Sequence, residues 1–167
     1  EKKMTVIDRA LQAALAINDA YLHARALAEL AQVLTGEQID RALQAALAIN
    51  DKNCRVRALA GLAPVLTGEQ KASVIENALQ AVSAFHSEDT SVDVLRALAP
   101  LLTSEQTDRA LRAALAIRNE FARAHALEAL APVLIGEQID QALQAALAIY
   151  SDYYRADALA ELAPVLN

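Results

Sequence analysis

The sequence predicts an all-α fold, a right-handed α-solenoid of about five antiparallel helix pairs, or about ten helices. Three observations predict this fold. The chain repeats itself with a period of about 32 residues, and its apolar fraction of 55% comes with only 4% aromatic residues and no Trp. It also contains only four Gly and four Pro. Ala, the commonest apolar residue of the chain, is the best helix former, whereas a sheet needs Val, Ile, Thr and aromatic residues.

The repeat is visible as a recurring phrase. Residues 7–19 and 39–51 share the sequence IDRALQAALAIND, and related copies begin at Ile75, Thr107 and Ile139. The copies are 32 residues apart except before the third, where residues 71–74 are inserted. We therefore expect one repeat domain over residues 1–167. Its repeats lie at about 7–38, 39–70, 71–106, 107–138 and 139–167.

The first helix of each repeat has a clear start and a wide apolar face. The sequence Thr35-Gly-Glu-Gln38 has the spacing of a capping box, and Thr67 and Gln70 repeat it. The helix that follows Thr35 has apolar residues at the i, i+3, i+4, i+7 and i+8 positions, which are Ile39, Ala42, Leu43, Ala46 and Leu47. Further apolar residues leave only a narrow polar stripe. We therefore expect this helix to be packed on several sides.

A turn and a second helix complete each repeat. Asn50 and Asp51 favour a turn because their side chains compete for backbone hydrogen bonds. The second helix of the 39–70 repeat is expected to run to about the Leu-Ala-Pro sequence at Pro64 and to close with a further turn. The insertion at 71–74 is close to one helical turn. It predicts either a longer first helix in the third repeat or a bend in the array.

Composition excludes several classes of function. The net charge of −6 and the low isoelectric point weigh against nucleic acid and against an anionic membrane surface. A single cysteine, Cys54, suits a reducing compartment, and no segment reads as a signal peptide or a membrane span, so a cytoplasmic location is expected. No metal-binding, phosphate-binding or nucleophile motif is present. We expect no enzyme activity, no cofactor and no metal, and a passive, half-buried Cys54.

Equivalent positions of the repeats line up into three rows of candidate binding residues. The glutamine row, on the polar stripe of the first helices, contains Gln12, Gln44, Gln80, Arg112 and Gln144. The turn row, pointing toward the end of the first helices, contains His23, Arg55, Ser91, Arg123 and Arg155. The variable row, on the outward side of the second helices, contains Tyr21, Asn53, Asp89, Phe121 and Tyr153, flanked by Arg25, Arg57, Asp93, His125 and Asp157. Its densest part is the cluster of Tyr150, Tyr153 and Tyr154.

Each row has a functional and a structural interpretation. Amide and guanidinium groups in the glutamine row would bind the backbone of an extended peptide, although Gln and Arg are also ordinary exposed helix formers. Cations of the turn row are expected to satisfy carbonyls at helix ends. The variable row differs most between copies, and its Tyr, Phe and Arg residues are typical of interface hot spots, although single exposed aromatic residues are common.

The consensus of the copies, ALAIxDxxxRAxALAxLAPVL, resembles the short two-helix repeats that form arrays in large bacterial multidomain proteins. Those arrays resemble tetratricopeptide and HEAT-type solenoids and often lie beside a signalling NTPase module. The resemblance implies a sensor or scaffold arm.

Together, these observations predict a non-catalytic module that binds a protein or peptide. The alternatives are a structural segment with no dedicated ligand, or a designed or duplicated repeat. The last repeat ends in ordinary repeat sequence and not in a polar cap, so the chain is expected to be a fragment of a longer array or to self-associate end to end.

Overall fold

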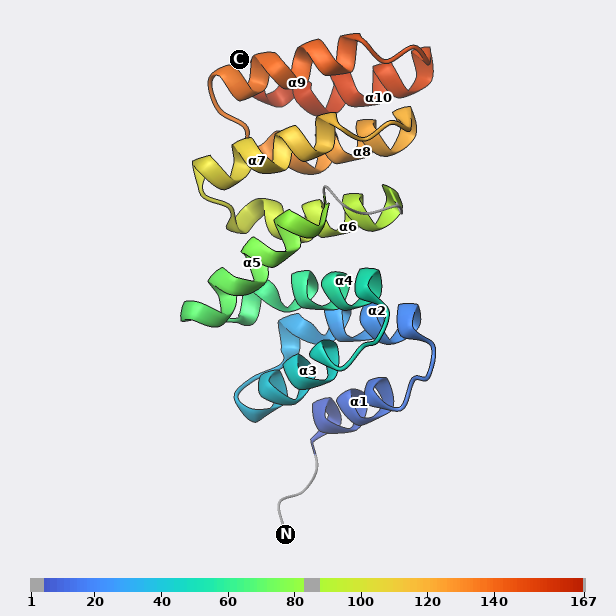
Figure 1. Ribbon diagram of the computed structural model, residues 1–167, viewed down its shortest axis with the longest axis vertical. Helices are drawn as coiled ribbons and strands as arrows, with labels where there is room; N and C mark the ends of the chain where they lie inside the picture. The colour runs from blue at the N-terminus through green and yellow to red at the C-terminus, as the bar shows by residue number, and fades with distance from the viewer. Residues whose placement is uncertain (1–4, 83–87, 167) are drawn as a thin grey trace. The chain divides into compact units, whose positions relative to one another are not determined.

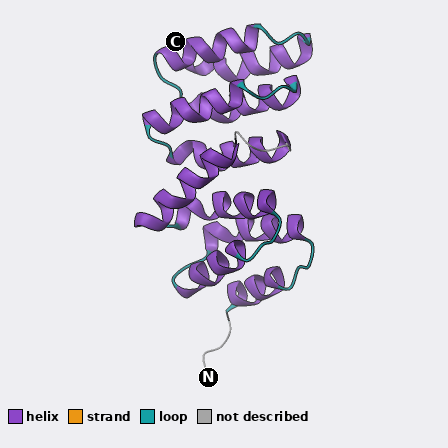
Figure 2. Ribbon diagram, in the orientation of Figure 1, coloured by secondary structure: helices purple, strands orange, loops and turns teal. Residues whose placement is uncertain are grey.

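The protein is all-α. The structure, a computed structural model, describes residues 5–82 and 88–166, without the side chains of Glu88 and Asp89. Within these ranges there are ten α-helices and no strand (Figures 1 and 2). The helices are α1 (Val6–Leu15), α2 (Ala20–Leu30), α3 (Glu37–Leu47), α4 (Lys52–Leu62), α5 (Gly68–Val82), α6 (Glu88–Leu98), α7 (Ser104–Leu115), α8 (Glu120–Leu130), α9 (Glu137–Leu147) and α10 (Asp152–Leu162).

The chain divides into two compact units. The first unit, Glu1–Ala78, holds α1 to α4 and most of α5, and the second unit, Leu79–Asn167, holds the end of α5 and α6 to α10. In the first unit α1 packs on α2, α3 packs on α4, and the second helices α2 and α4 pack on each other. In the second unit α7 packs on α8, α9 packs on α10, and α8 packs on both α6 and α10. Each unit is therefore an array of helix pairs, as the repeat predicts.

The helix starts differ from the predicted capping box. Gln38 Oε1 accepts a hydrogen bond from the Thr35 N–H at 3.2 Å, but the N-cap of α3 is Gly36, with φ 49°. A positive φ suits only a residue without Cβ, so the glycine begins the helix in place of the threonine. The complete box forms where Ser104 replaces the glycine: Thr103 caps α7, and Gln106 binds back to the Thr103 N–H.

The same glutamine also joins neighbouring repeats, which the sequence analysis did not foresee. Gln38 Nε2 donates to Asp8 Oδ1 at 2.8 Å, and Gln138 Nε2 donates to Asp108 Oδ1 at 2.5 Å. Hydrogen bonds from Thr5 and then Gln38 lower the pKa of the Asp8 carboxyl. In each unit, one glutamine side chain therefore bonds to the backbone at the start of its own helix and also binds the first helix of the preceding repeat.

The turn and the second helix follow the prediction. Asp51 caps α4 by accepting a hydrogen bond from the Cys54 N–H at 2.8 Å, which lowers the pKa of Asp51. Helix α4 ends at Leu62, and a 3-10 turn at Ala63–Val65 contains Pro64. The first repeat has Gln32 at the proline position and forms the same 3-10 turn. The proline therefore fits the turn but is not needed to make it.

The inserted residues 71–74 lengthen the first helix of the third repeat. Helix α5 has 15 residues, whereas the equivalent α3 has 11. Four residues are close to one turn, so the apolar face continues across the insertion.

The core consists of leucines embedded among alanines. Leu11, Leu27 and Leu62 are fully buried in the first unit, as are Leu111 and Leu130 in the second. Each fully buried leucine contributes about 1.5–3 kcal/mol relative to an exposed one. Small residues let the second helices approach closely: a Cβ added to Gly61 on α4 would lie 2.3 Å from the Ala28 Cβ on α2.

The first helices are less enclosed than expected. Leu47 and Leu147, in the last turns of α3 and α9, are 50% and 57% exposed. Ala48 and Ala148, directly after them, are exposed as well. The prediction that these helices are packed on several sides is therefore wrong for their last turns, where the apolar face meets solvent.

Candidate functional site

The turns between paired helices are held by arginines of the turn row. The Nη1 atoms of Arg55, Arg123 and Arg155 donate to the carbonyl oxygens of Ile49, Ile117 and Ile149 at 2.7, 3.0 and 2.9 Å. These carbonyls lie just after the first helices, where no helical N–H reaches them. The structural interpretation of this row is confirmed for the three arginines.

His23 occupies the arginine position in the first repeat. Its Nε2 is buried and has no hydrogen-bond partner among the described residues. The imidazole is shorter than an arginine side chain, so the first repeat lacks the bond that secures the equivalent turns.

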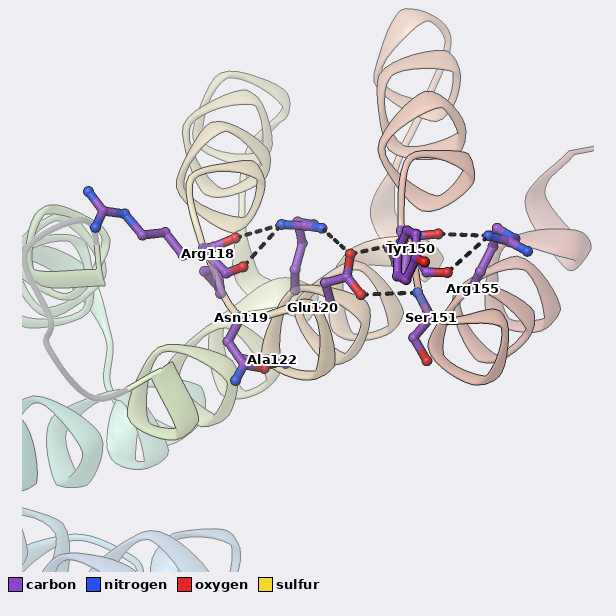
Figure 3. A network of polar contacts seen from close by, with 10 residues as sticks. Arg118, Asn119, Glu120, Ala122, Tyr150, Ser151 and Arg155 are labelled. Carbon is purple, nitrogen blue, oxygen red and sulfur yellow. Dashed lines mark hydrogen bonds and ion pairs between the residues drawn. The ribbon is translucent and has the colours of Figure 1, made fainter.

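A carboxylate joins two successive turns of the second unit (Figure 3). Glu120, at the start of α8, accepts hydrogen bonds from the backbone N–H of Tyr150 at 2.7 Å and of Ser151 at 3.1 Å. Arg123 lies 3.7 Å from the same carboxylate. The bond from Tyr150 and then the bond from Ser151 lower the pKa of Glu120. This contact fixes the start of α10 against the start of α8.

Four side chains of α8 and α10 form one exposed cluster beside that contact, which we call the aromatic surface: Phe121, His125, Tyr153 and Tyr154. The Phe121 ring lies edge-on to His125 with centroids 4.3 Å apart, and to Tyr154 at 5.5 Å. Tyr153 lies edge-on to Tyr154 at 5.3 Å. Phe121 remains 43% exposed and Tyr153 71%. The rings are therefore ordered by one another, while Phe121 and Tyr153 remain open to solvent.

A polar edge borders the aromatic surface. His125 Nδ1 lies 2.7 Å from Glu128 Oε2, and Arg96 on α6 lies 3.6 Å from Glu128 Oε1. The sequence analysis missed Arg96 and Glu128, although a signal was present. At the equivalent position the other three repeats carry Ala28, Ala60 and Ala160, so charged residues occur only in the middle of the second unit.

The first unit brings together fewer of the predicted residues. The Arg57 guanidinium lies over the Tyr21 ring, with Cζ 4.6 Å from the centroid, and Tyr21 is 46% exposed. Arg25 is exposed and Asn53 half-buried on the same two helices, α2 and α4. The side chain of the equivalent Asp89 lies outside the described residues.

The two glutamine-row candidates lie on the first helices and not on the aromatic surface. Gln44 is exposed on α3. Arg112 on α7 lines a groove of about 410 Å³ together with Gln80 at the end of α5. A second groove, of about 550 Å³, lies between α7 and α9 and includes Gln144.

Cys54 has the properties of a passive thiol. Burial, and then the hydrogen bond with Asp51, raise its pKa to about 11. A thiol with so high a pKa is almost entirely protonated at neutral pH and is a poor nucleophile.

The described ranges contain neither a candidate metal cluster nor a candidate membrane-spanning helix. There, no group of three or more His, Cys, Asp and Glu side chains is placed to hold a metal ion. None of the described helices is both long and apolar enough to cross a bilayer.

Comparisons of the chain with protein-family models, with curated proteins and with solved structures find no match.

Proposed function

We propose that the protein is a non-catalytic protein-interaction module that receives a partner on the aromatic surface of α8 and α10. The observation that carries the proposal is the set of edge-to-face contacts among Phe121, His125, Tyr153 and Tyr154, which leaves large rings exposed. The chain has only four Tyr and two Phe, and three of these six lie in this cluster.

Physical chemistry favours this surface as a binding site. Tyr and Phe bring large apolar area with few rotatable bonds, and Tyr is enriched among hot-spot residues. Rings already ordered by their neighbours lose little further entropy when a partner binds. Arg96 and Glu128 add a polar border, as interfaces commonly have around an apolar centre.

A binding role suits the remaining surfaces better than catalysis does. The two grooves of the second unit are lined by Arg, Gln and small apolar residues, with no nucleophile or general base among the described lining residues. We further propose that the chain belongs to the bacterial two-helix repeat arrays that resemble tetratricopeptide and HEAT-type solenoids. In that setting it would act as a cytoplasmic sensor or scaffold arm.

The test compares partner capture by matched variants. The bait carrying Phe121→Ala and Tyr153→Ala should lose proteins that the unchanged chain captures from a lysate of the native host, as measured by quantitative mass spectrometry. Tyr150→Ala is the control, because Tyr150 is even more exposed than Tyr153 but is not part of the ring contacts of the aromatic surface. Identical capture by both variants would refute the proposal. Capture that is lost only together with thermal stability would refute it as well.

The second candidate is self-association, which the exposure of α10 favours. Ala124, Ala131 and Leu134 of the fourth repeat are 4% exposed or less. Their equivalents Ala156 and Ala163 are exposed, and Leu166 is 44% exposed. A second copy of this chain would cover these residues as α10 covers α8. Light scattering over a concentration range should then show a mass that grows with concentration, and a constant monomer mass excludes this candidate.

A further inference from the structure

The two grooves of the second unit flank helix α7. The first groove is lined by Leu79 and Gln80 of α5 and by Arg109, Arg112, Ala113 and Ala116 of α7. The second groove is lined by Leu115 of α7, Arg123 of α8 and Gln141, Gln144, Ala145 and Ala148 of α9. Both are on the first-helix side of their repeats, and neither includes a residue of the aromatic surface.

Their charge is opposite to that of the protein. The whole chain has a net charge of −6, with 21 acidic and 15 Lys and Arg residues. The twelve described residues that line the grooves include three arginines and three glutamines but no Asp or Glu. Arg112 is exposed. Arg123 donates to the Ile117 carbonyl and lies 3.7 Å from the Glu120 carboxylate, so its guanidinium is already paired within the turn.

From this arrangement we infer that the two grooves bind an extended, acidic peptide segment across α7. The proposal concerns a second surface and does not depend on the aromatic surface. A carboxylate of the peptide would pair with Arg112 in the first groove, and Gln141 and Gln144 would bind the peptide backbone in the second.

The floor and walls of the grooves fit a peptide backbone. Ala113, Ala116, Ala145 and Ala148 present only methyl groups, so a main chain can approach the helices closely. Gln80 and Gln144 each offer one carbonyl and one NH₂ group, which match the N–H and C=O groups of an extended strand. Leu79 and Leu115 add apolar contact for the stems of the peptide side chains.

A single-stranded nucleic acid fits these grooves less well than a peptide does. Non-specific strands are held by aromatic rings that stack on the bases, together with an extended basic surface. The described groove residues include no aromatic ring, and the negative net charge of the chain repels a polyanion of high charge density.

The test selects ligands from a random peptide library displayed on phage, with the whole 167-residue chain as bait. Peptides that carry Asp or Glu should be enriched, and Arg112→Glu should weaken the selected peptide about tenfold in calorimetry, with affinity falling as salt is added. Arg25→Glu makes the same charge change on α2, outside both grooves, and should leave binding unchanged. Phe121→Ala should also leave it unchanged, which separates this site from the aromatic surface.

Four outcomes would overturn the inference. They are no enrichment of acidic peptides, selected peptides that are mainly apolar, equal binding by Arg112→Glu and the unchanged chain, or tighter binding of a single-stranded oligonucleotide than of the selected peptide. Circular dichroism of Arg112→Glu shows that any loss is not due to unfolding, since the side chain is exposed and not part of the core.

Discussion

Replacing Gly61 by Ala reverses the usual preference for alanine within a helix. A Cβ at this position would lie 2.3 Å from the Ala28 Cβ and 2.8 Å from the Ala28 Cα. Carbon atoms in contact are normally about 3.5–4.0 Å apart, so α2 and α4 must separate by more than about 1 Å. No rotamer change relieves the contact, because one of the two atoms belongs to the backbone.

The net effect follows from two opposing free energies. Alanine gains about 1 kcal/mol over glycine in a helix interior. Overpacking a well-packed contact costs about 1–3 kcal/mol, and a contact with backbone belongs at the upper end. We expect Gly61→Ala to lower the free energy of unfolding by about 1–2 kcal/mol, from the difference between these terms. At this chain length the melting temperature should then fall by about 2–8 °C.

Urea denaturation followed by circular dichroism measures this change, and two further variants control it. Ala129→Gly, at the equivalent position of α8, should also destabilise the protein by about 1 kcal/mol, because alanine is the better residue there. Combining Ala28→Gly with Gly61→Ala removes one of the two clashing Cβ atoms, and the pair should lose less stability than the sum of the single changes. A Gly61→Ala protein about 1 kcal/mol more stable than the parent would refute the close approach of α2 and α4.

Two further substitutions and one labelling experiment test other parts of the structure. His23→Arg should stabilise the protein by about 1 kcal/mol in urea denaturation, because an arginine can reach the Ile17 carbonyl and the buried, unpaired Nε2 is removed. Glu120→Gln should lower stability at neutral pH. The substitution should also make stability fall less steeply in acid. The lowered pKa of Glu120 means that the ionised carboxylate stabilises the fold at pH values above 4.5, the usual pKa of Glu. This contribution disappears as the pH falls through the pKa of the folded state. Cys54 should react slowly with iodoacetamide at pH 8 and faster as pH approaches its pKa of about 11.

A specific result would contradict each of these three predictions. A His23→Arg protein no more stable than the parent would show that the first turn does not need the arginine bond. If Glu120→Gln loses stability in acid as steeply as the parent does, the bonds to Tyr150 and Ser151 do not stabilise the fold. Glu161→Gln, at an exposed residue, is the control. Rapid alkylation of native Cys54 at pH 8, equal to that of the urea-unfolded chain, would contradict the raised pKa.

The repeat makes much of the fold predictable. The same sequence pattern occurs five times, so five copies support each helix boundary. The positions of the turns and the role of Arg55, Arg123 and Arg155 could therefore be predicted from the pattern. Both partners of such a bond lie within one repeat, six residues apart. Local spacing determines a contact of this kind.

Contacts between repeats were harder to predict. The rings of Phe121 and Tyr154 come from different repeats, and their meeting depends on how far α10 is shifted along α8. Arg96 and Glu128 were overlooked because the other three repeats carry alanine at this position. The start of α3 was misassigned because Gly36 takes a positive φ, which makes the glycine the cap and leaves only half of the predicted box.

The hydrogen bond from Gln38 to Asp8 bears on how such a chain lengthens over generations. A duplicated segment of one repeat length carries a glutamine equivalent to Gln38 near its start and an aspartate equivalent to Asp8 shortly after it. Inserted in frame, its glutamine would lie near the aspartate of the preceding copy, as Gln38 lies beside Asp8 and Gln138 beside Asp108. Gene duplication can therefore add a repeat that already carries the residues for contacts with its neighbours. This agrees with the identical sequences at residues 7–19 and 39–51.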